Sequence, residues 1–64
     1  MKIYIEKDNR HISEDTACTT RELLESLKIN PSTVIVVKNG TVVLDDELLE
    51  TKDDIQILSV VSGG

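Results

Sequence analysis

Cysteine is nearly absent from this 64-residue sequence, which contains only Cys18. An iron–sulfur cluster needs four cysteine ligands, and a structural zinc ion needs about four cysteine or histidine ligands, so both kinds of site are excluded. One cysteine also has no partner for a disulfide within the chain. A single domain of this size must therefore depend on regular secondary structure and on close packing of its own core.

Aromatic side chains and long apolar runs are also scarce. Tyr4 is the only aromatic residue, so the core must be built from Ile, Val and Leu. Such β-branched side chains favour strands packed against a helix. No stretch approaches the roughly 20 apolar residues of a membrane span, and none resembles the apolar region of a secretory signal. We therefore expect a soluble, cytoplasmic protein of one domain with no membrane partner.

Basic residues are the minority, seven against twelve acidic ones, and the formal net charge is −5. Affinity for nucleic acid comes mainly from neutralising phosphates, so this excess of carboxylates argues against a nucleic-acid partner. The same charge would suit docking onto a basic protein surface. It also keeps a small domain soluble, which is the simpler explanation.

Side-chain arrangements typical of enzymes are missing. There is no Ser/His/Asp set and no phosphate-binding glycine loop. The acidic stretches at 45–47 and 53–54 lack the ligand spacing and the glycine of a calcium loop, so we expect solvated turns there. His11 has no catalytic partner near it in the sequence and is expected on the surface of a strand. These features predict no catalytic activity, no metal site and no bound cofactor.

The first residues predict a β-hairpin. Residues 2–6 alternate between apolar and polar side chains, with Ile3 and Ile5 on one face. A polar turn follows, and residues 10–14 are expected to return as a short strand with Ile12 pointing inward.

A helix is predicted after the hairpin. Thr19 stands three residues before Glu22, the spacing of a capping box in which each side chain binds the other residue's backbone N–H. The apolar side chains then share one helical face: Leu23, Leu24 and Leu27. Pro31 is expected to end the helix, because a proline disfavours helical backbone at the residue before it. Cys18, just before the cap, is more typical of a small core residue than of a redox thiol.

The second half of the chain predicts further strands. Residues 34–37 form a continuous β-branched run, typical of a central strand. Asn39 and Gly40 form the dipeptide preferred in a type I′ turn, because both positions need positive φ. Residues 42–44 are expected to return antiparallel to the central strand.

The rest of the chain is expected to contain one turn and one more strand. Residues 45–49 look like a helical turn or a loop, with Leu48 and Leu49 tucked under the sheet. Residues 55–61 form the last and longest strand. The resulting order predicts an α+β protein of the β-grasp (ubiquitin-like) type, ββαββ with a mixed sheet packed on one helix. We expect the β-grasp domain to span residues 1–61 and a flexible tail to span residues 62–64.

The alternation of the last strand predicts which side chains stay uncovered. Ile55 and Ile57 are expected to face the helix. The opposite face would then carry three residues: Gln56, Leu58 and Val60. In the central strand one of two pairs would join them: Ile35 with Val37, or Val34 with Val36. A contiguous apolar patch of this kind on a small domain usually marks a partner site.

Gly63 and Gly64 close the sequence directly after the last strand and Ser62. Two residues without a Cβ form a narrow, flexible thread, which suits a tail drawn into a partner's active site. The reactive group would be the α-carboxylate of Gly64, activated as a mixed anhydride with AMP. A frayed end or an expression remnant is the alternative for glycines at a terminus. The ubiquitin-like order of the preceding elements favours the functional interpretation.

Two segments carry a family resemblance: residues 36–43, around the Asn-Gly turn, and residues 53–64. Together with the order and length of the elements, they resemble the ThiS/MoaD family of sulfur carriers over nearly the whole chain. The resemblance implies a cycle carried out by partner proteins. A ThiF/MoeB-like adenylating enzyme, using ATP with Mg²⁺, would convert Gly64 into an acyl-adenylate. A sulfurtransferase or a persulfide donor would then supply sulfur.

The same resemblance implies roles for residues of this chain. Gly64 would carry first the adenylate and then the thiocarboxylate, while Gly63 and Ser62 would thread the partner's active site. The partner-binding face on the last strand would comprise three residues: Gln56, Leu58 and Val60. The thiocarboxylate would finally donate its sulfur in cofactor biosynthesis, to the substrate of a sulfur-accepting synthase.

The identity of the acceptor separates branches of the family. Molybdopterin members are usually longer and often carry prolines before the final glycines, so the length and the Asn-Gly turn favour thiamin thiazole as the acceptor. Molybdopterin and thiolated tRNA stay open. Two other functions stay open as well. One is a ubiquitin-like modifier joined to lysines through Gly64, and the other is a passive β-grasp interaction module that binds through its apolar face.

Overall fold

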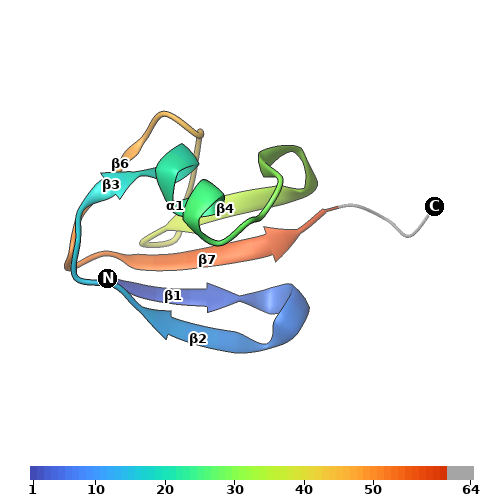
Figure 1. Ribbon diagram of the computed structural model, residues 1–64, viewed down its shortest axis with the longest axis horizontal. Coiled ribbons are helices and arrows are strands. Elements are labelled where there is room, and N and C mark those ends of the chain that lie inside the picture. Colours follow the sequence, from blue (N-terminus) through green and yellow to red (C-terminus); the bar gives the residue numbers. More distant parts are fainter. Residues whose placement is uncertain (61–64) are drawn as a thin grey trace.

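The computed structural model describes residues 1–60, which form a mixed five-stranded sheet crossed by one α-helix (Figure 1). The strands lie in this spatial order: β2 (Arg10–Ser13), β1 (Lys2–Ile5), β7 (Asp54–Ser59), β4 (Val34–Lys38) and β5 (Thr41–Val43). β1 and β7 run parallel at the centre, and every other pairing in this sheet is antiparallel. The α+β, β-grasp prediction is confirmed.

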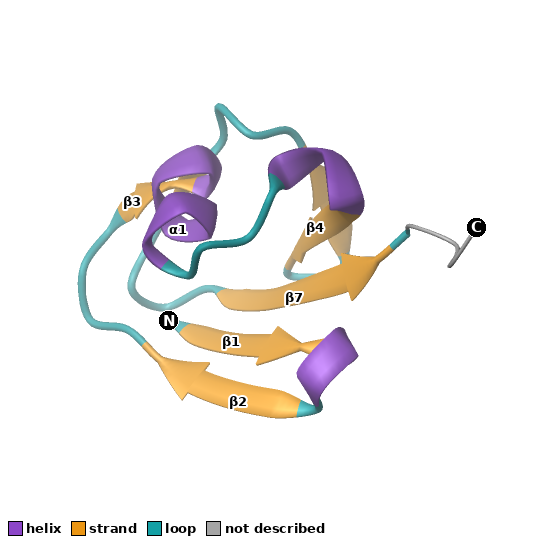
Figure 2. Ribbon diagram, turned by 45° about the vertical axis from the view of Figure 1, so that its right-hand side comes forward, coloured by secondary structure: helices purple, strands orange, loops and turns teal. Residues whose placement is uncertain are grey.

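The opening hairpin forms as predicted, with β1 and β2 in register from Lys2 opposite Ser13 to Ile5 opposite Arg10. Its turn is a short 3₁₀ helix, η1 (Glu6–Asp8), followed by Asn9 at φ +47°. Asparagine tolerates left-handed backbone better than most residues. Figure 2 shows this turn at the end of the molecule where β7 finishes.

The helix α1 (Thr20–Ser26) begins at the predicted capping box. The hydroxyl oxygen of Thr19 accepts a hydrogen bond from the backbone N–H of Glu22 at 3.2 Å. In return, Oε1 of Glu22 accepts one from the backbone N–H of Thr19 at 2.9 Å. Two of the unpaired N–H groups at the helix start are therefore satisfied by local side chains.

The predicted end of the helix at Pro31 is wrong, because the chain leaves the helix earlier. Lys28 adopts left-handed backbone at φ +59°. Its N–H donates to the carbonyl of Glu25 at 3.0 Å, and the N–H of Ile29 donates to the carbonyl of Leu24 at 2.9 Å. This pair of bonds is a Schellman motif, which satisfies the last carbonyls of the helix. Pro31 instead begins a second 3₁₀ helix, η2 (Pro31–Thr33).

The turn between β4 and β5 has the predicted backbone. Asn39 lies at φ +50° and Gly40 at φ +86°, the two positive angles that the dipeptide was expected to supply. The register then places Val37 opposite Val42 and Val36 opposite Val43.

Residues 45–49 form the predicted turn only in part, because residues 45–47 are a turn and a loop while the last two residues differ. Leu48 and Leu49 form a short strand, β6 (Leu48–Leu49), which pairs antiparallel with β3 (Cys18–Thr19) in a second, two-stranded sheet. Leu49 is completely buried, as expected, but Leu48 is 54% exposed, so its predicted burial is wrong. Successive residues of a strand point to opposite faces, so only one of the two leucines can enter the core.

Asp53 is not the solvated turn residue that was predicted, since it is only 5% exposed. Its carboxylate accepts hydrogen bonds from the backbone N–H of Glu50 at 2.8 Å and from the side-chain amide of Asn39 at 2.9 Å. The ammonium group of Lys38 lies 3.6 Å away. These contacts, with the N–H of Glu50 the strongest, hold the pKa of Asp53 below its usual range. They join the start of β7 to the β4–β5 turn.

The core lies between α1 and the sheet. Its buried members are apolar and come from both layers: Met1, Ile3, Ile5, Leu23, Leu24, Val36, Leu49, Ile55 and Ile57. As predicted, Ile12, Cys18 and Leu27 pack against this cluster as partly buried side chains. Neither α1 nor any other helix in residues 1–60 is long and apolar enough to cross a membrane.

Candidate functional site

The C-terminal end of β7 lies at the opposite end of the sheet from Met1 (Figure 1). β7 ends at Ser59, and the backbone N–H of Val60 donates to the carbonyl of Thr33 at 3.0 Å. The chain is therefore fixed to the sheet up to Val60. The remaining predicted site residues lie outside the described residues, together with the end of the predicted strand: Val61, Ser62, Gly63 and Gly64.

The alternation along β7 places the predicted partner-binding residues on the side of the sheet away from α1. Ile55 and Ile57 are buried beneath the helix. Gln56 and Val60 are exposed, and Leu58 is half-buried. The position of these side chains is as predicted, while their role as partner contacts stays a prediction.

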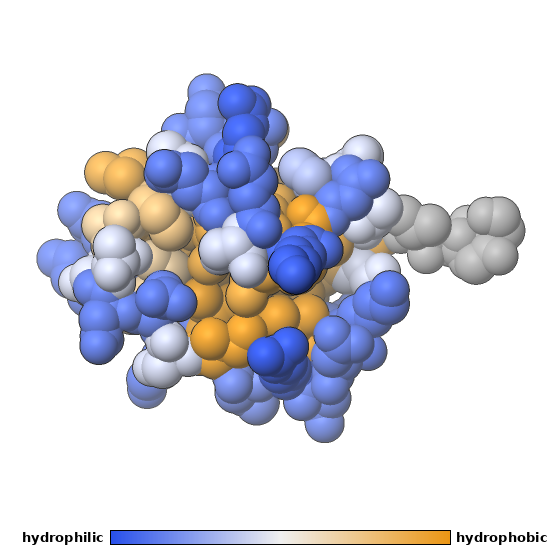
Figure 3. Space-filling model, in the orientation of Figure 1, coloured by the Kyte–Doolittle hydropathy of each residue, from blue (hydrophilic) through white to orange (hydrophobic). Residues whose placement is uncertain are grey.

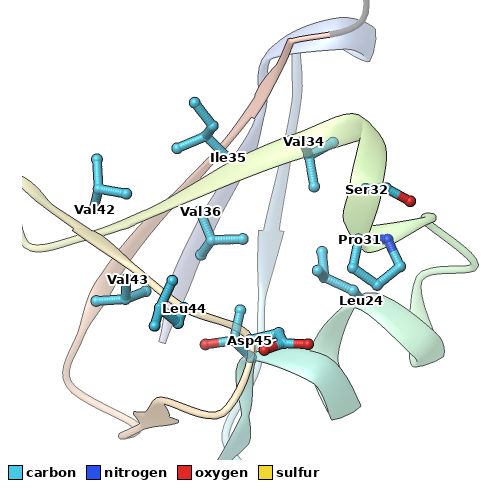
Figure 4. A pocket seen from close by; sticks show the side chains of 11 residues that line it. Leu24, Pro31, Ser32, Val34, Ile35, Val36, Val42, Val43, Leu44 and Asp45 are labelled. Carbon is cyan, nitrogen blue, oxygen red and sulfur yellow. The ribbon is translucent and has the colours of Figure 1, made fainter.

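The neighbouring strands extend this surface. Ile35 lies directly opposite Leu58, and Val37 lies opposite both Gln56 and Val42, so all share one face. The alternative pair in β4 is excluded, since Val36 is buried. Figure 4 shows Ile35 and Val42 on one side of β4, and Val34 and Val36 on the side of Leu24.

We call this surface the open-face patch and define it by five apolar residues: Ile35, Val37, Val42, Leu58 and Val60. Val42 is its most exposed member at 63%, and Val60 follows at 48%. Sequence reasoning missed Val42, although the two-residue Asn-Gly turn fixes its register opposite Val37. Five neighbouring apolar side chains on the uncovered face of a small sheet suit protein contact.

Beside the open-face patch lies a pair of rings. Tyr4 is the cross-strand neighbour of both Gln56 and His11, and the Tyr4 and His11 rings lie 4.8 Å apart between centroids. His11 is exposed on its strand, as predicted. The hydroxyl of Tyr4 donates to the side-chain oxygen of Asn9 at 3.1 Å, which holds the ring in place. The middle of this face therefore offers aromatic and amide groups next to aliphatic ones.

A groove of about 510 Å³ lies at the outer edge of β4 and β5 (Figure 4). β5 has three residues and ends before it can pair with Val34. The groove is lined mainly by aliphatic side chains, and its one carboxylate, that of Asp45, is bound to Arg21 at 2.8 Å. Arg21 lowers the pKa of Asp45, so this carboxylate is charged and neutralised in place. The groove contains no group suited to acid–base catalysis at neutral pH.

Cys18 packs against the core, as predicted for a small apolar residue. Burial raises the pKa of its thiol, and the nearby carboxylates of Glu22 and Glu14 raise it further. The thiolate is the nucleophilic form of cysteine, so this environment disfavours reactivity. Among residues 1–60 no three His, Cys, Asp or Glu side chains are close enough together to hold a metal ion.

Comparison with known proteins identifies one family. Residues 2–64 match the model of the ThiS family. Sulfur carrier protein TtuB of Thermus thermophilus is 44% identical over 45 residues, which cover 69% of this chain and 68% of that protein. An uncharacterized protein of Archaeoglobus fulgidus is 46% identical over 43 residues, covering 67% of this chain and 63% of that protein.

Solved structures share the fold. The crystal structure of the thiamine biosynthesis protein ThiS from Geobacter metallireducens has a TM-score of 0.67 and 24% identity, and the match covers 100% of both chains. An NMR structure of a thiamine biosynthesis protein from the same organism has a TM-score of 0.63 and 23% identity, covering 100% of this chain and 88% of that one. At this level of identity the likeness supports the β-grasp fold alone.

Proposed function

Because the chain belongs to the ThiS family of sulfur carriers, we propose that the group it carries is attached to the α-carboxylate of Gly64. A carboxylate is a poor acyl donor and must first be activated. An ATP-dependent adenylating enzyme would join it to the α-phosphorus of ATP and release pyrophosphate. Hydrosulfide would then attack the acyl carbon, displace AMP and leave a thiocarboxylate. A persulfide would instead displace AMP to form an acyl disulfide, and a second thiol would cleave its S–S bond to release the thiocarboxylate.

The extent of the family match is the observation that carries this proposal. The match runs to residue 64 and so includes the terminal Gly63 and Gly64. The described part of the chain offers no better carrier group, since Cys18 is packed against the core with a raised pKa. A terminal carboxylate that partner enzymes activate and load needs no catalytic group supplied by this chain.

We further propose that the adenylating enzyme docks on the open-face patch. The patch lies on β4, β5 and β7, and β7 is the strand from which the tail departs. A partner seated there is well placed to take up Ser62, Gly63 and Gly64. Gln56 supplies a polar group next to Val37 that fixes orientation, a common role of polar groups beside apolar contacts.

We propose that the sulfur is incorporated into the thiazole of thiamin, with a sulfur-accepting synthase as the last partner. The Asn-Gly turn supports this branch, as the resemblance to thiamin-type members implies. Molybdopterin and thiolated tRNA are the alternatives, and the relative TtuB carries only the general name of a sulfur carrier protein. Incubating the thiocarboxylate form with each purified acceptor system and following loss of sulfur from the protein distinguishes them.

ATP–pyrophosphate exchange with a cognate adenylating enzyme tests the activation step. We expect exchange with the full chain and none after deletion of Gly64, while Lys52→Gln, in the exposed turn before β7, serves as a control that keeps the terminus. Circular dichroism should show the same fold in all three proteins. Absence of exchange with the full chain, when the enzyme is active on another carrier, would contradict the proposal and favour a passive interaction module.

The exchange assay does not separate a sulfur carrier from a ubiquitin-like modifier, because both require the adenylate. A search for conjugates linked to lysine makes that distinction. We expect the activated chain to be released as a thiocarboxylate when a sulfur source is present. Accumulation of lysine-linked products instead would assign the chain to the modifiers.

A further inference from the structure

A second hollow, of about 520 Å³, lies on the helix side of the sheet between η1, the segment after α1 and the end of β7. This volume falls in the range of about 300–1,000 Å³ that is typical of binding pockets. Its walls are formed by five apolar residues: Ile5, Leu27, Ile29, Val34 and Ile57. In the view of Figure 3, apolar side chains gather in the middle of the molecule over β1 and β7.

Two lysines also line this hollow, Lys7 from η1 and Lys28 from the helix end. In the part of the chain that the structure describes, neither forms an ion pair, whereas Lys38 is bound to Glu47 at 3.2 Å. Asp8 is the one acidic residue among the lining side chains. On a molecule of net charge −5, the hollow is therefore a local basic site with an apolar interior.

The backbone fixes the position of one of these lysines. Lys28 occupies the left-handed position of the Schellman motif, held by the two hydrogen bonds that close α1. A residue at this position has its Cα–Cβ direction set by the turn. Its ammonium group is the end of a flexible stem beside Leu27 and Ile29, which suits contact with an anion at the rim of the hollow.

The hollow also adjoins the end of β7, close to the last described residue. Ser59 and Thr33 line it, and Thr33 accepts the hydrogen bond from Val60 that fixes the last described residue. Any protein that takes up residues 61–64 approaches this end of the molecule. The open-face patch is on the opposite side of the sheet, so the hollow is a separate surface.

We propose that this hollow binds an acidic segment of the adenylating enzyme, one that places an apolar side chain next to a carboxylate. The apolar side chain would enter among Ile29, Val34 and Ile57. The carboxylate would pair with Lys7 and Lys28. The adenylating enzyme would then contact both sides of the sheet, the open-face patch on one side and the hollow on the other. The nature of the partner rests on the proposed function, while the chemistry of the hollow does not.

NMR titration of the isotope-labelled chain tests the hollow without any enzyme. The probe is a short capped peptide of alternating leucine and aspartate, compared with peptides of leucine and asparagine and of serine and aspartate. We expect shifts at Lys7, Lys28 and Thr33 with the first peptide, and at least tenfold weaker binding of the other two. Absence of these shifts, or equal binding of the three peptides, would overturn the proposal. Equal shifts with inorganic phosphate would also overturn it, in favour of a simple anion site.

The double variant Lys7→Gln/Lys28→Gln should bind the leucine–aspartate peptide at least tenfold more weakly than the unchanged chain. Lys52→Gln is the control for loss of a lysine charge away from the hollow, because its turn precedes β7 while the hollow lies at the end of β7. Glutamine keeps the Cβ and Cγ of lysine and both side chains are exposed, so we expect unchanged circular dichroism. Equal weakening by Lys52→Gln would contradict a specific site.

The same variants in the adenylation assay test the partner. We expect the KM for the chain to rise about tenfold in the double variant with little change in kcat, and no change with Lys52→Gln. If the unchanged chain is adenylated and the double variant has the same KM as Lys52→Gln, docking through the hollow is overturned. If the unchanged chain is not adenylated at all, the proposed function fails, and the peptide titration alone decides on the hollow.

Discussion

Two side chains, those of Asn39 and Asp53, connect the β4–β5 turn to the turn that precedes β7. The carboxylate of Asp53 accepts hydrogen bonds from Glu50 and Asn39, and Oδ1 of Asn39 accepts the backbone N–H of Asp54 at 2.9 Å. Asn39 therefore binds both a buried acid and the first residue of β7 while it adopts the left-handed backbone of the turn. One side chain combines the conformational and the hydrogen-bonding role.

The lowered pKa of Asp53 predicts a pH dependence of stability. A carboxyl group whose pKa is lower in the folded state stabilises the fold fully above its unfolded pKa of about 3.9. That contribution disappears as the pH falls through the lowered folded pKa. At pH 7 the Asp53→Asn variant should therefore have a lower urea midpoint of unfolding than the unchanged chain. The difference between the two midpoints should shrink in strong acid.

The control for this experiment is Asp46→Asn, which changes an exposed carboxylate in the turn after β5. We expect its urea midpoint at pH 7 to stay close to that of the unchanged chain. A difference between Asp53→Asn and the unchanged chain that is the same at neutral and acid pH would show that the ionised carboxylate does not contribute through these hydrogen bonds.

Cys18 provides a second prediction for a single residue. Its raised pKa and its packing against the core leave it protonated at neutral pH, so it should not carry sulfur. Cys18→Ala should fold with a small loss of stability and should be loaded with sulfur at an unchanged rate, as followed by intact-protein mass spectrometry. Loss of loading in a folded Cys18→Ala protein would make the thiol part of the sulfur pathway.

Among the secondary-structure elements, those set by neighbouring residues were predictable and those set by distant contacts were not. The capping box of Thr19 and Glu22 and the turn at Asn39 and Gly40 have sequence signals of four residues or fewer. The helix end at Lys28 has no such signal. Its left-handed backbone is maintained by the Schellman bonds together with packing of Leu24 and Ile29, and no glycine marks the position.

The second sheet was missed for the same reason. β3 and β6 have two residues each, too few for an alternating pattern, and they are brought together by tertiary packing. Thr20 illustrates this contact, because its backbone N–H and its hydroxyl both donate to the carbonyl of Glu47. The burial of Asp53 was unpredictable for the same reason, since its hydrogen-bond partner Asn39 lies in a different turn.

Gly40 gives a prediction for the β4–β5 hairpin. A Cβ at this position would meet no atom within 4 Å, so only the backbone at φ +86° opposes a side chain. Gly40→Ala should therefore cost about 1–2 kcal/mol of unfolding free energy, measured by urea denaturation. Gly40→Asn is the control and should lose less, because asparagine tolerates left-handed backbone. An alanine variant as stable as the unchanged chain would contradict this account of the turn.

The open-face patch gives a prediction for the sheet. Val60→Asp places a charge on a side chain that is 48% exposed, so we expect little loss of stability. If the adenylating enzyme docks on the patch, the KM for the chain should rise at least tenfold. Leu48→Asp is the matched control, because Leu48 is similarly exposed at 54% but lies on β6 outside the patch. Equal effects of the two substitutions would argue against docking on the patch.

On the scale of the whole molecule, the fold was predictable because its order of elements permits few packings. A hairpin, an amphipathic helix and three further strands bury their apolar faces in two layers. The apolar side of β7 followed from alternation alone. The basic hollow could not be foreseen, since Lys7 and Lys28 are far apart in the sequence and meet only when η1 and the helix end lie beside β7.

The arrangement as a whole presents two different surfaces on the two sides of the sheet. Its sheet offers an apolar patch on one side and a basic hollow on the other, and the strand between them leads to the predicted carrier terminus. The chain as a whole has a net charge of −5, which disfavours non-specific association of this small domain. The two proposed partner surfaces thus flank β7, and the proposed carrier residue Gly64 follows this strand in the sequence.

Intact-protein mass spectrometry tests the central claim most directly. The chain is incubated with a cognate adenylating enzyme, ATP with Mg²⁺ and a sulfur source, alongside a chain that lacks Gly64. We predict a mass gain equal to the replacement of one oxygen by sulfur in the full chain, located at Gly64 by fragmentation, and no gain in the deleted chain. An unchanged mass in the full chain, with an enzyme shown to load another carrier, would contradict the assignment of Gly64 as the site of sulfur transfer.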